Sequence, residues 1–368
     1  MMSEKSKLLI GTGKGLLVYE RGDDGWNCLG DHFLGLPVSV AWVDEREGTW
    51  WAALAHRHWG QKLHRSADGG KSWEEVSVPT YPEDARLQNG KPATLRKIWV
   101  IAHGGDDRPG VLLMGTEPGA LFRSENNGDS WELVESLWNH PSRKKQWFGA
   151  GRDQPYIHSI VVDPRDSSHY YIAVSCAGVF ETMNDGQSWE VRNEGLRAAY
   201  LPNPEAEIGH DPHRMLACRS RPDVLWQQNH CGIYRSTNGG LQWEEVSDKD
   251  GFPAYGFALA VDNSNPERAW VIPAVSDEVR VAVDRALCVC RTEDGGQSWQ
   301  EQRSGLPQSY CYDIVFRHSL DSDGNCLAFG STTGNLYVSE DMGASWMQLS
   351  HNLPRINFVH FINIALDT

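Results

Sequence analysis

The sequence contains no long apolar run, no C-x-x-C cysteine pair and no Asn-X-Ser/Thr sequon. No run approaches the ~18 consecutive apolar residues that a membrane-spanning helix needs. The early apolar run, Leu8–Ile10, is too short for the core of a signal peptide. The eight cysteines lack a disulfide or metal-binding spacing and are typical of reduced, buried thiols. We therefore expect a cytoplasmic protein without a membrane partner.

The sequence also lacks an excess of positive charge. It has 34 Lys and Arg against 49 Asp and Glu, a formal net charge of -15 over 368 residues. Such a chain repels a phosphate backbone, so nucleic acid is not the expected partner. What the sequence has in abundance is glycine, with 36 residues, and tryptophan, with 16. Many turn residues combined with large flat rings favour a fold of many short strands.

A repeat runs along the whole chain. Its pattern is Ser or Thr, then Asp or Asn two residues later, Gly two after that, and Trp three further on. Six copies of this box occupy residues 66–73, 124–131, 182–189, 236–243, 292–299 and 339–346, and an eroded copy occupies 21–26. Successive box tryptophans lie 47 to 58 residues apart. That interval suits a four-stranded unit with loops of variable length.

The chemistry of the box is that of a tight turn. Its Asp or Asn accepts hydrogen bonds from backbone N–H groups, Ser or Thr adds a second local bond, and Gly supplies a positive φ. The Trp then packs between neighbouring sheets. We therefore expect the acidic box residues to be structural and not catalytic.

The units predict a seven-bladed β-propeller over residues 1–368, an all-β single domain. The N-terminus begins with a second-strand pattern at 7–11, whereas the C-terminus ends with an unpartnered strand at 356–366. We expect the last strand to complete the first sheet and close the ring, because closure removes an exposed edge. First strands of the other blades are expected near Val38, Leu95, His158, His213, Tyr255 and Tyr312.

The boxes resemble the Asp-box, or BNR, repeat of sialidase-like and xyloglucanase-like propellers and of photosystem II assembly factors. The resemblance is strongest to bacterial cytosolic BNR-repeat proteins labelled glycosyl hydrolases. It covers nearly the whole chain and implies the propeller fold. It is nearly silent on function, because hydrolases, sorting receptors and assembly factors share the box.

In such a propeller the box turns lie on one face, and ligands usually bind at the opposite, upper face. Three long segments are expected to feed that face, namely 135–157, 195–212 and 276–286. Long connections in a regular scaffold tend to be functional. Trp147, beside the basic run at 143–145, and Arg57 are candidate contacts for a small or sugar-like ligand.

Histidines are the candidate metal ligands. Aligning the blades places His158 and His213 at the same first-strand position of adjacent blades, with Tyr312 at that position in the last blade. A third-strand alignment adds Asn229 and His230 to the same rim, and His210 lies nearby. Three converging imidazoles predict a divalent transition metal such as Zn²⁺. The competing interpretation is that these rings only hydrogen-bond a loop, water or ligand. His103, His169 and His318 are expected at solvated turns of the lower face.

Three alternatives remain for the function. A glycosidase would need two carboxylates at the rim, for which Glu117, Asp153, Glu207 and Asp211 are available. A lyase-like enzyme would use His158, His213 and Tyr312 as base and acid. Across these two enzyme alternatives, the catalytic candidates are Tyr312, Glu117 and Asp211. A binding or assembly propeller with a protein partner would need no catalysis. The sialidase function that the resemblance implies is not supported, since the chain does not open with the expected Arg-Ile-Pro segment.

Overall fold

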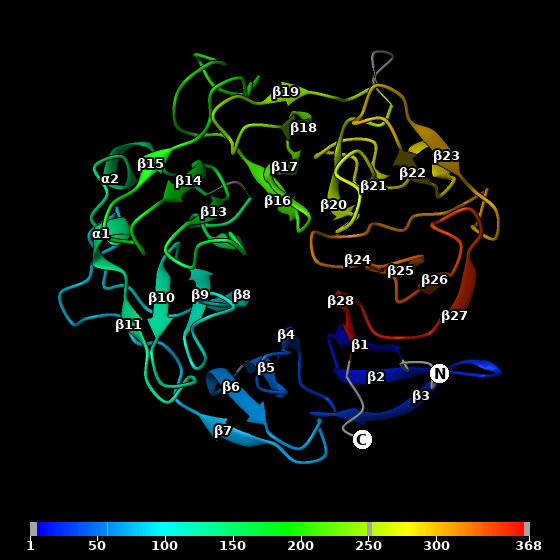
Figure 1. Ribbon diagram of the computed structural model, residues 1–368, viewed down its shortest axis with the longest axis horizontal. Helices are drawn as coiled ribbons and strands as arrows, with labels where there is room; N and C mark the ends of the chain where they lie inside the picture. Colours follow the sequence, from blue (N-terminus) through cyan, green and yellow to red (C-terminus); the bar gives the residue numbers. More distant parts are fainter. Residues whose placement is uncertain (1–5, 57, 150, 249–251, 364–368) are drawn as a thin grey trace.

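Seven four-stranded antiparallel sheets surround a central channel in the computed structural model, which describes residues 6–56, 58–149, 151–248 and 252–363 (Figure 1). The fold is the predicted all-β, seven-bladed β-propeller. The helices within those residues are short: α1 (Glu135–Trp138), α2 (Arg143–Gln146) and the 3-10 turn η1 (Val283–Arg285). They lie in two of the long segments that the sequence marked as insertions.

The blades follow one another around the ring, each running from an inner strand at the channel to an outer strand. Blades 2 to 4 contain β4 (Val38–Asp44), β5 (Thr49–His56), β6 (Gly60–Ser66) and β7 (Glu74–Val76); β8 (Lys97–His103), β9 (Leu112–Glu117), β10 (Leu121–Ser124) and β11 (Glu132–Leu133); and β12 (Ile157–Val162), β13 (Tyr170–Val174), β14 (Gly178–Thr182) and β15 (Glu190–Val191). Blades 5 to 7 contain β16 (Pro212–Cys218), β17 (Arg221–Asn229), β18 (Gly232–Ser236) and β19 (Glu244–Glu245); β20 (Gly256–Val261), β21 (Ala269–Pro273), β22 (Val289–Thr292) and β23 (Gln300–Gln302); and β24 (Leu320–Asp323), β25 (Cys326–Gly330), β26 (Leu336–Ser339) and β27 (Met347–Ser350).

Blade 1 joins the two ends of the chain. It contains β1 (Ser6–Thr12), β2 (Gly15–Gly22) and β3 (Gly25–His32), and its inner strand is β28 (Ile356–Asn363). β28 pairs antiparallel with β1 along its length and lies between the inner strands β24 and β4. The predicted closure by the last strand is therefore present, although residues 364–366 of that prediction lie outside the described residues.

The six strong boxes form the expected turns. In the first, the Ser66 hydroxyl accepts a hydrogen bond from the Gly70 amide at 2.9 Å, and Asp68 Oδ1 accepts one from the Ser72 amide at 2.9 Å. The same two bonds recur in the other five. The eroded copy at 21–26 is instead a plain hairpin in which Gly22 pairs with Gly25.

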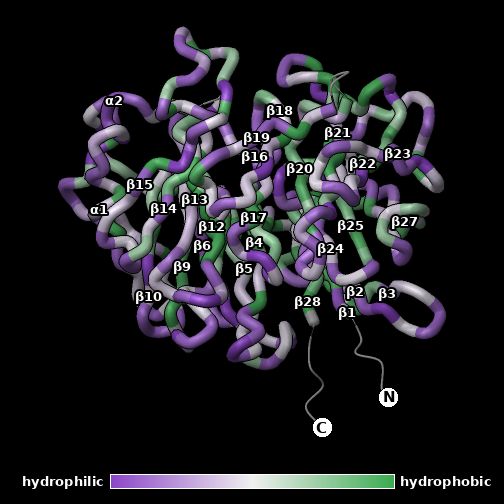
Figure 2. The backbone as a smooth tube through the Cα atoms, turned by 45° about the horizontal axis from the view of Figure 1, so that its top comes forward, coloured by the Kyte–Doolittle hydropathy of each residue, from purple (hydrophilic) through white to green (hydrophobic). Residues whose placement is uncertain are grey.

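Three box tryptophans, Trp189, Trp243 and Trp299, hydrogen-bond to the preceding blade. The Trp243 indole donates a hydrogen bond to the Arg192 carbonyl of the preceding blade at 2.8 Å, and Trp299 does the same to Val246. The sheets carry most of the apolar residues, whereas polar residues dominate the connections (Figure 2). The box turns therefore help to build the ring.

Inner strands carry a bulge near the end that faces away from the boxes. The pairing register shifts around Ser39, Trp99, His158 and His213 in blades 2 to 5. An extra residue in a strand bends it and re-aims a side chain. In blade 4 the box begins at Thr182, at the end of the sheet opposite to His158. The bulges therefore lie at the rim of the channel on the face away from the boxes.

Blade 7 departs from the prediction. Its regular inner strand begins at Leu320, and Tyr312 precedes it in irregular backbone with about half of its side chain exposed. The cause is a larger bulge: the Gly330 amide bonds to the Ser319 carbonyl, whereas the Thr332 amide bonds to the Ile314 carbonyl. Residues 315–318 are thus set opposite Ser331, which directly follows β25, and Phe316, Arg317 and His318 reach the pocket in the channel.

In the described part of the chain, no helix has the length and apolar character needed to cross a membrane.

Candidate functional site

A pocket of about 380 Å³ opens at the end of the channel that carries the bulges. Its lining comes from inner strands and from the connections between blades: Ser39, Lys97, Trp99, Gly151, Arg152, Tyr156, Asp211, His213, His230, Tyr255, Phe257, Asp277, Arg280, Phe316, Arg317, His318, Arg355, Ile356 and Asn357. All seven blades or their connections contribute. No residue of the six strong boxes is among them, so the pocket occupies the face opposite the box turns.

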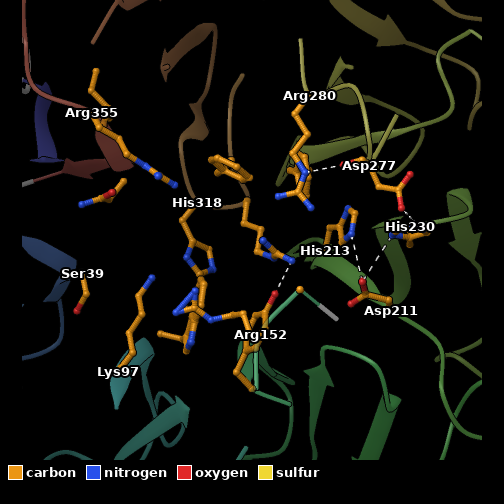
Figure 3. A pocket seen from close by; sticks show the side chains of 18 of the residues that line it. Ser39, Lys97, Arg152, Asp211, His213, His230, Asp277, Arg280, His318 and Arg355 are labelled. Atoms are coloured by element: carbon orange, nitrogen blue, oxygen red, sulfur yellow. Dashed lines mark hydrogen bonds and ion pairs between the residues drawn. The ribbon is translucent and has the colours of Figure 1, made fainter. Parts of the chain in front are cut away.

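One side of the pocket carries Asp211, His213 and His230, which we call the Asp–His cluster (Figure 3). One ligand-type atom from each residue lies within 4.8 Å of the other two. His213 Nε2 is 3.4 Å from Asp211 Oδ2, and His230 Nδ1 is 3.7 Å from the same oxygen. Asp211 and His213 are buried, and His230 is partly exposed to the pocket.

Neighbouring groups fix the orientation of the cluster. His213 Nδ1 lies 2.6 Å from the Gly256 carbonyl oxygen, which can only accept, so this nitrogen carries the proton. Asp211 Oδ1 accepts a hydrogen bond from the Ser175 hydroxyl at 2.6 Å. His213 Nε2 and Asp211 Oδ2 are thus left facing each other. They are too far apart for a good hydrogen bond between them.

The charges in the cluster favour a cation. Burial lowers the pKa of His213, and the nearby Asp211 only partly opposes this. Burial acts to raise the pKa of Asp211, but the contact with His213, the charge of Arg317 and the hydrogen bond from Ser175 outweigh it and hold the pKa well below its usual range. The contact between His213 and Asp211 is attractive only when a proton or another cation lies between them, because an unprotonated imidazole nitrogen and a carboxylate oxygen both present lone pairs and repel each other. A positive ion between them removes the repulsion.

Two of the predicted metal ligands lie outside the cluster. His158 is fully buried; its Nε2 donates a hydrogen bond to the Pro212 carbonyl at 2.7 Å, and its Nδ1 accepts one from the Ser159 hydroxyl. Burial holds its pKa well below the usual value, so the ring is neutral. His210 is likewise buried, with Nε2 donating to the Ala206 carbonyl. The structure therefore brings His213 and His230 together but leaves His158 and His210 apart from them, and Asp211 is the third member of the cluster.

Most of the other candidates also lie away from the pocket. Trp147 is buried against Phe180, and Asn229 is buried with its side chain holding the turn at Cys231, so neither lines the pocket. The exposed Tyr312 is absent from the lining, so the lyase arrangement of His158, His213 and Tyr312 is not assembled. Arg57 lies outside the described residues.

Glu117 has a supporting position. Its carboxylate is buried behind the pocket and accepts a hydrogen bond from Arg152 Nε at 2.7 Å. Among the glycosidase candidates, Asp211 lines the pocket, whereas Glu117, Asp153 and Glu207 do not. His318 was expected on the lower face, but the bulge of blade 7 places it in the pocket lining, with Nε2 donating to the His158 carbonyl at 2.8 Å.

A second group of residues, which no sequence pattern indicated, faces the Asp–His cluster across the pocket. Lys97, Arg152 and Arg355 lie on that side, and Arg317 lines the same cavity (Figure 3). We call these four residues the cationic wall. With Arg280 the pocket has five Lys and Arg side chains against two carboxylates, Asp211 and Asp277. The four wall residues come from segments far apart in the sequence, so no local motif could have found them.

Aromatic rings support the cationic wall. Trp99 and Tyr156 stack with ring centroids 4.3 Å apart. Lys97 Nζ lies 3.4 Å from the Trp99 ring centroid, and the Arg317 guanidinium lies 5.3 to 5.8 Å from the rings of Trp99, Tyr156 and Phe257. Ring faces attract cations, although more weakly than a carboxylate does. The wall thus keeps its positive charge available to a ligand.

Comparisons with known proteins agree with the fold. No known protein-family profile matches the chain. An oligoxyloglucan-reducing end-specific xyloglucanase of Emericella nidulans is 24% identical over 218 residues, which is 52% of this chain and 25% of that protein. The chain thus spans about a quarter of the length of this curated relative.

Two solved structures share the propeller architecture. An ancestral GH74 enzyme superposes with a TM-score of 0.57 at 16% identity, covering 97% of this chain and 40% of its own. YCF48 bound to D1 peptide superposes with a TM-score of 0.53 at 16% identity, covering 91% of this chain and 89% of its own. At these identities the likeness establishes the fold alone.

Proposed function

We propose that this propeller is a small-molecule-binding protein that holds a divalent transition metal at Asp211, His213 and His230 and binds its ligand at that metal. The observation that carries the proposal is the pair of nitrogens that face one carboxylate oxygen at 3.4 and 3.7 Å. Two ligand atoms bound tetrahedrally at ~2.1 Å from one ion lie about 3.4 Å apart. The spacing therefore suits coordination better than direct hydrogen bonding.

The other hydrogen bonds made by the proposed metal-binding side chains are of the kind found around metal sites. A metal-binding imidazole commonly donates its other N–H to a backbone carbonyl, and a ligating carboxylate is itself hydrogen-bonded. The bonds from His213 to Gly256 and from Ser175 to Asp211 are of this kind. With three protein ligands, the remaining coordination positions would face the pocket and accept a ligand oxygen or water.

Tyr255 adds a group that could contact such a ligand. It lines the pocket next to His213 and His230, and its buried hydroxyl has no hydrogen-bond partner among the described residues. Burial raises the pKa of Tyr255 to about 12, so the hydroxyl keeps its proton at neutral pH. It would donate to an oxygen of the bound molecule.

The test is metal stoichiometry. Chelator-treated protein is titrated with Zn²⁺, Mn²⁺ and Ni²⁺ by calorimetry, and the metal retained after gel filtration is measured. We expect one ion per chain, strongly weakened binding in Asp211→Asn and His213→Ala, and unchanged binding in His351→Ala, whose side chain is exposed elsewhere. Absence of stoichiometric metal, or equal binding in all variants, would refute the site.

A second candidate function is glycoside hydrolysis at the same pocket. It is favoured by Asp211 and Asp277, which lie on either side of His230: its Nδ1 is 3.7 Å from Asp211 and its Nε2 is 3.5 Å from Asp277. Two carboxylates separated by room for water or substrate are what a glycosidase uses. Release of reducing sugar from xyloglucan oligosaccharides, lost in Asp277→Asn with metal binding retained, would establish this function instead.

A role as an assembly propeller has a different signature. The structure of YCF48 bound to D1 peptide shows that a propeller of this kind can hold a peptide. The enclosed, charged pocket of this chain is better suited to a small molecule than to a flat protein surface. Peptide binding that is unchanged in pocket variants such as Asp211→Asn and His213→Ala would support the assembly role.

A further inference from the structure

We propose that the cationic wall formed by Lys97, Arg152, Arg317 and Arg355 binds a dianionic oxyanion group of the ligand, such as a phosphate monoester. The proposal deepens the proposed function, since it names the ligand class of the same pocket. The wall and the Asp–His cluster share no residue, so either site can fail without the other.

Arg317 is the centre of the wall. Its side chain is 9% exposed, yet in the described part of the chain no carboxylate lies within ion-pair distance of it. Its Nη2 donates to the Tyr156 hydroxyl at 2.6 Å, and its Nε has no hydrogen-bond partner within that part of the chain. Buried guanidinium groups are normally paired, because leaving a buried donor unsatisfied is costly. An anion in the pocket would satisfy it.

The neighbouring cations are also without a carboxylate of their own. Within the described residues, neither Lys97 nor Arg355 forms an ion pair, and each lies over a ring, Trp99 and Phe316 respectively. Arg152 alone is paired, with the buried Glu117. Three basic side chains without a carboxylate partner among the described residues thus converge on one cavity in a chain whose net charge is -15.

The number of unpaired charges favours a dianion over a single carboxylate. A phosphate monoester carries a charge of about -1.5 to -2 at pH 7 and offers three acceptor oxygens. A carboxylate supplies one negative charge and would leave more of the wall uncompensated. Burial, and then the charge of Arg152, lower the pKa of Lys97 to about 7, so this amine is about half charged at pH 7 and a bound dianion would favour its protonated form.

The arrangement of the pocket also specifies the rest of the ligand. Stacked Trp99 and Tyr156, with Phe257 and Phe316, give an aromatic surface beside the wall. Sugar and other ring compounds pack against such surfaces, whereas a free ion does not use them. A phosphorylated small molecule would reach from the wall toward the Asp–His cluster.

The test uses metal-free full-length protein and calorimetry with four probes: inorganic phosphate, a hexose 6-phosphate, the unphosphorylated hexose and the corresponding uronate. We expect the hexose phosphate to bind most tightly, phosphate more weakly, and the neutral sugar not at all. Arg317→Met and Arg355→Gln should each weaken hexose phosphate binding about tenfold or more. Arg221→Gln, a matched change at an exposed arginine on another face, should have no effect.

Several outcomes would overturn the proposal. Uronate binding as tightly as hexose phosphate would show that a single carboxylate is the ligand group. Loss of affinity in Arg221→Gln equal to that in Arg355→Gln would show diffuse charge attraction. If Arg317→Met fails to fold, the exposed Arg355 still decides the question. Asp211→Asn should lose metal and keep phosphate binding, so failure of the metal site is separately visible.

Discussion

His158 and His213 occupy equivalent bulges in neighbouring blades, but they bond to the next blade through different ring nitrogens. His158 uses Nε2, which donates to the Pro212 carbonyl at 2.7 Å, whereas His213 uses Nδ1, which donates to the Gly256 carbonyl at 2.6 Å. The first choice leaves Nδ1 against Ser159, and the second leaves Nε2 against Asp211. One residue position therefore yields an inter-blade link in blade 4 and a candidate metal ligand in blade 5.

The first prediction separates these two roles by replacing each histidine with alanine. His158→Ala should lower the free energy of unfolding by about 2 to 3 kcal/mol, since it opens a cavity and leaves the Pro212 carbonyl without its donor. His213→Ala also removes a buried ring, but it should in addition abolish stabilisation by metal. Denaturation with and without added Zn²⁺ makes the comparison.

The size of the metal effect is fixed by mass action. At a free metal concentration 100 times the dissociation constant, binding stabilises the folded state by about 2.7 kcal/mol. The wild type and His158→Ala should both gain this amount, and His213→Ala should gain nothing. A metal response retained in His213→Ala but lost in His158→Ala would reverse the assignment.

The two histidines also show how much of the structure could be predicted from the sequence. The repeat boxes predicted seven blades, because the chemistry of a turn is set by neighbouring residues. The complementary ends predicted the closing strand, because an unpaired edge strand needs a partner. Strand alignment placed both histidines at one rim. It could not tell which ring nitrogen each uses, because that depends on the carbonyl that the next blade presents.

The cationic wall could not have been predicted for a related reason. Lys97 is on an inner strand, Arg152 and Arg355 are in connections, and Arg317 is in the enlarged bulge of blade 7. The bulge sets four residues opposite one, which a regular strand alignment does not anticipate. That alignment therefore placed Tyr312 at the rim, where the structure has Phe316, Arg317 and His318.

The second prediction concerns the box of blade 4. Trp189 is buried against Tyr170, and its indole donates to the Ser136 hydroxyl at 3.0 Å. Trp189→Ala should therefore lower the free energy of unfolding by about 3 to 5 kcal/mol. Gly186→Ala should also destabilise, since Gly186 has φ +77° and an added Cβ would lie 2.6 Å from the Tyr170 hydroxyl.

Denaturant unfolding measures both changes, with Met183→Ala as the control because that neighbouring side chain is largely exposed. Ligand and metal affinities of the folded variants should equal those of the wild type, since the box lies on the opposite face from the pocket. Lost binding in a variant of normal stability would assign a functional role to the box.

The third prediction tests ring closure with a single methyl group. Gly11 on β1 faces Phe358 on β28, and a Cβ at Gly11 would overlap the Phe358 ring. Gly11→Ala should lower the free energy of unfolding by roughly 1 to 3 kcal/mol through overpacking. Gly13→Ala is the matched control, because its Cβ would come no closer than 3.9 Å to another residue.

Removing residues 356–368 is the larger version of the same test. Without β28, β1 becomes the inner strand of blade 1 and exposes a backbone edge to the channel, so we expect aggregation and loss of cooperative melting. A soluble truncated protein with the melting temperature of the full chain would contradict closure by the last strand.

The fourth prediction is a pH dependence of anion binding set by Lys97. Burial, followed by the charge of Arg152, lowers the pKa of Lys97 to about 7, with Glu117 opposing and Arg317 and Arg355 adding to the shift. An anion binds the protonated amine. Affinity should therefore be highest below pH 7 and fall as the pH rises through 7, because the lysine loses its charge.

Sulfate is the probe for this measurement, because it stays doubly charged over the range in which a phosphate monoester changes its own protonation, near pH 6. The other wall residues keep their charge between pH 6 and 8.5, since they are arginines, and burial holds the pKa of His318 well below the usual value, so that ring stays neutral. We expect the dissociation constant to rise about tenfold across this range. Lys97→Arg should bind sulfate with a nearly flat profile, because arginine remains charged throughout, and Lys97→Met should bind weakly at every pH. A wild-type profile as flat as that of Lys97→Arg would show that Lys97 does not take part in anion binding.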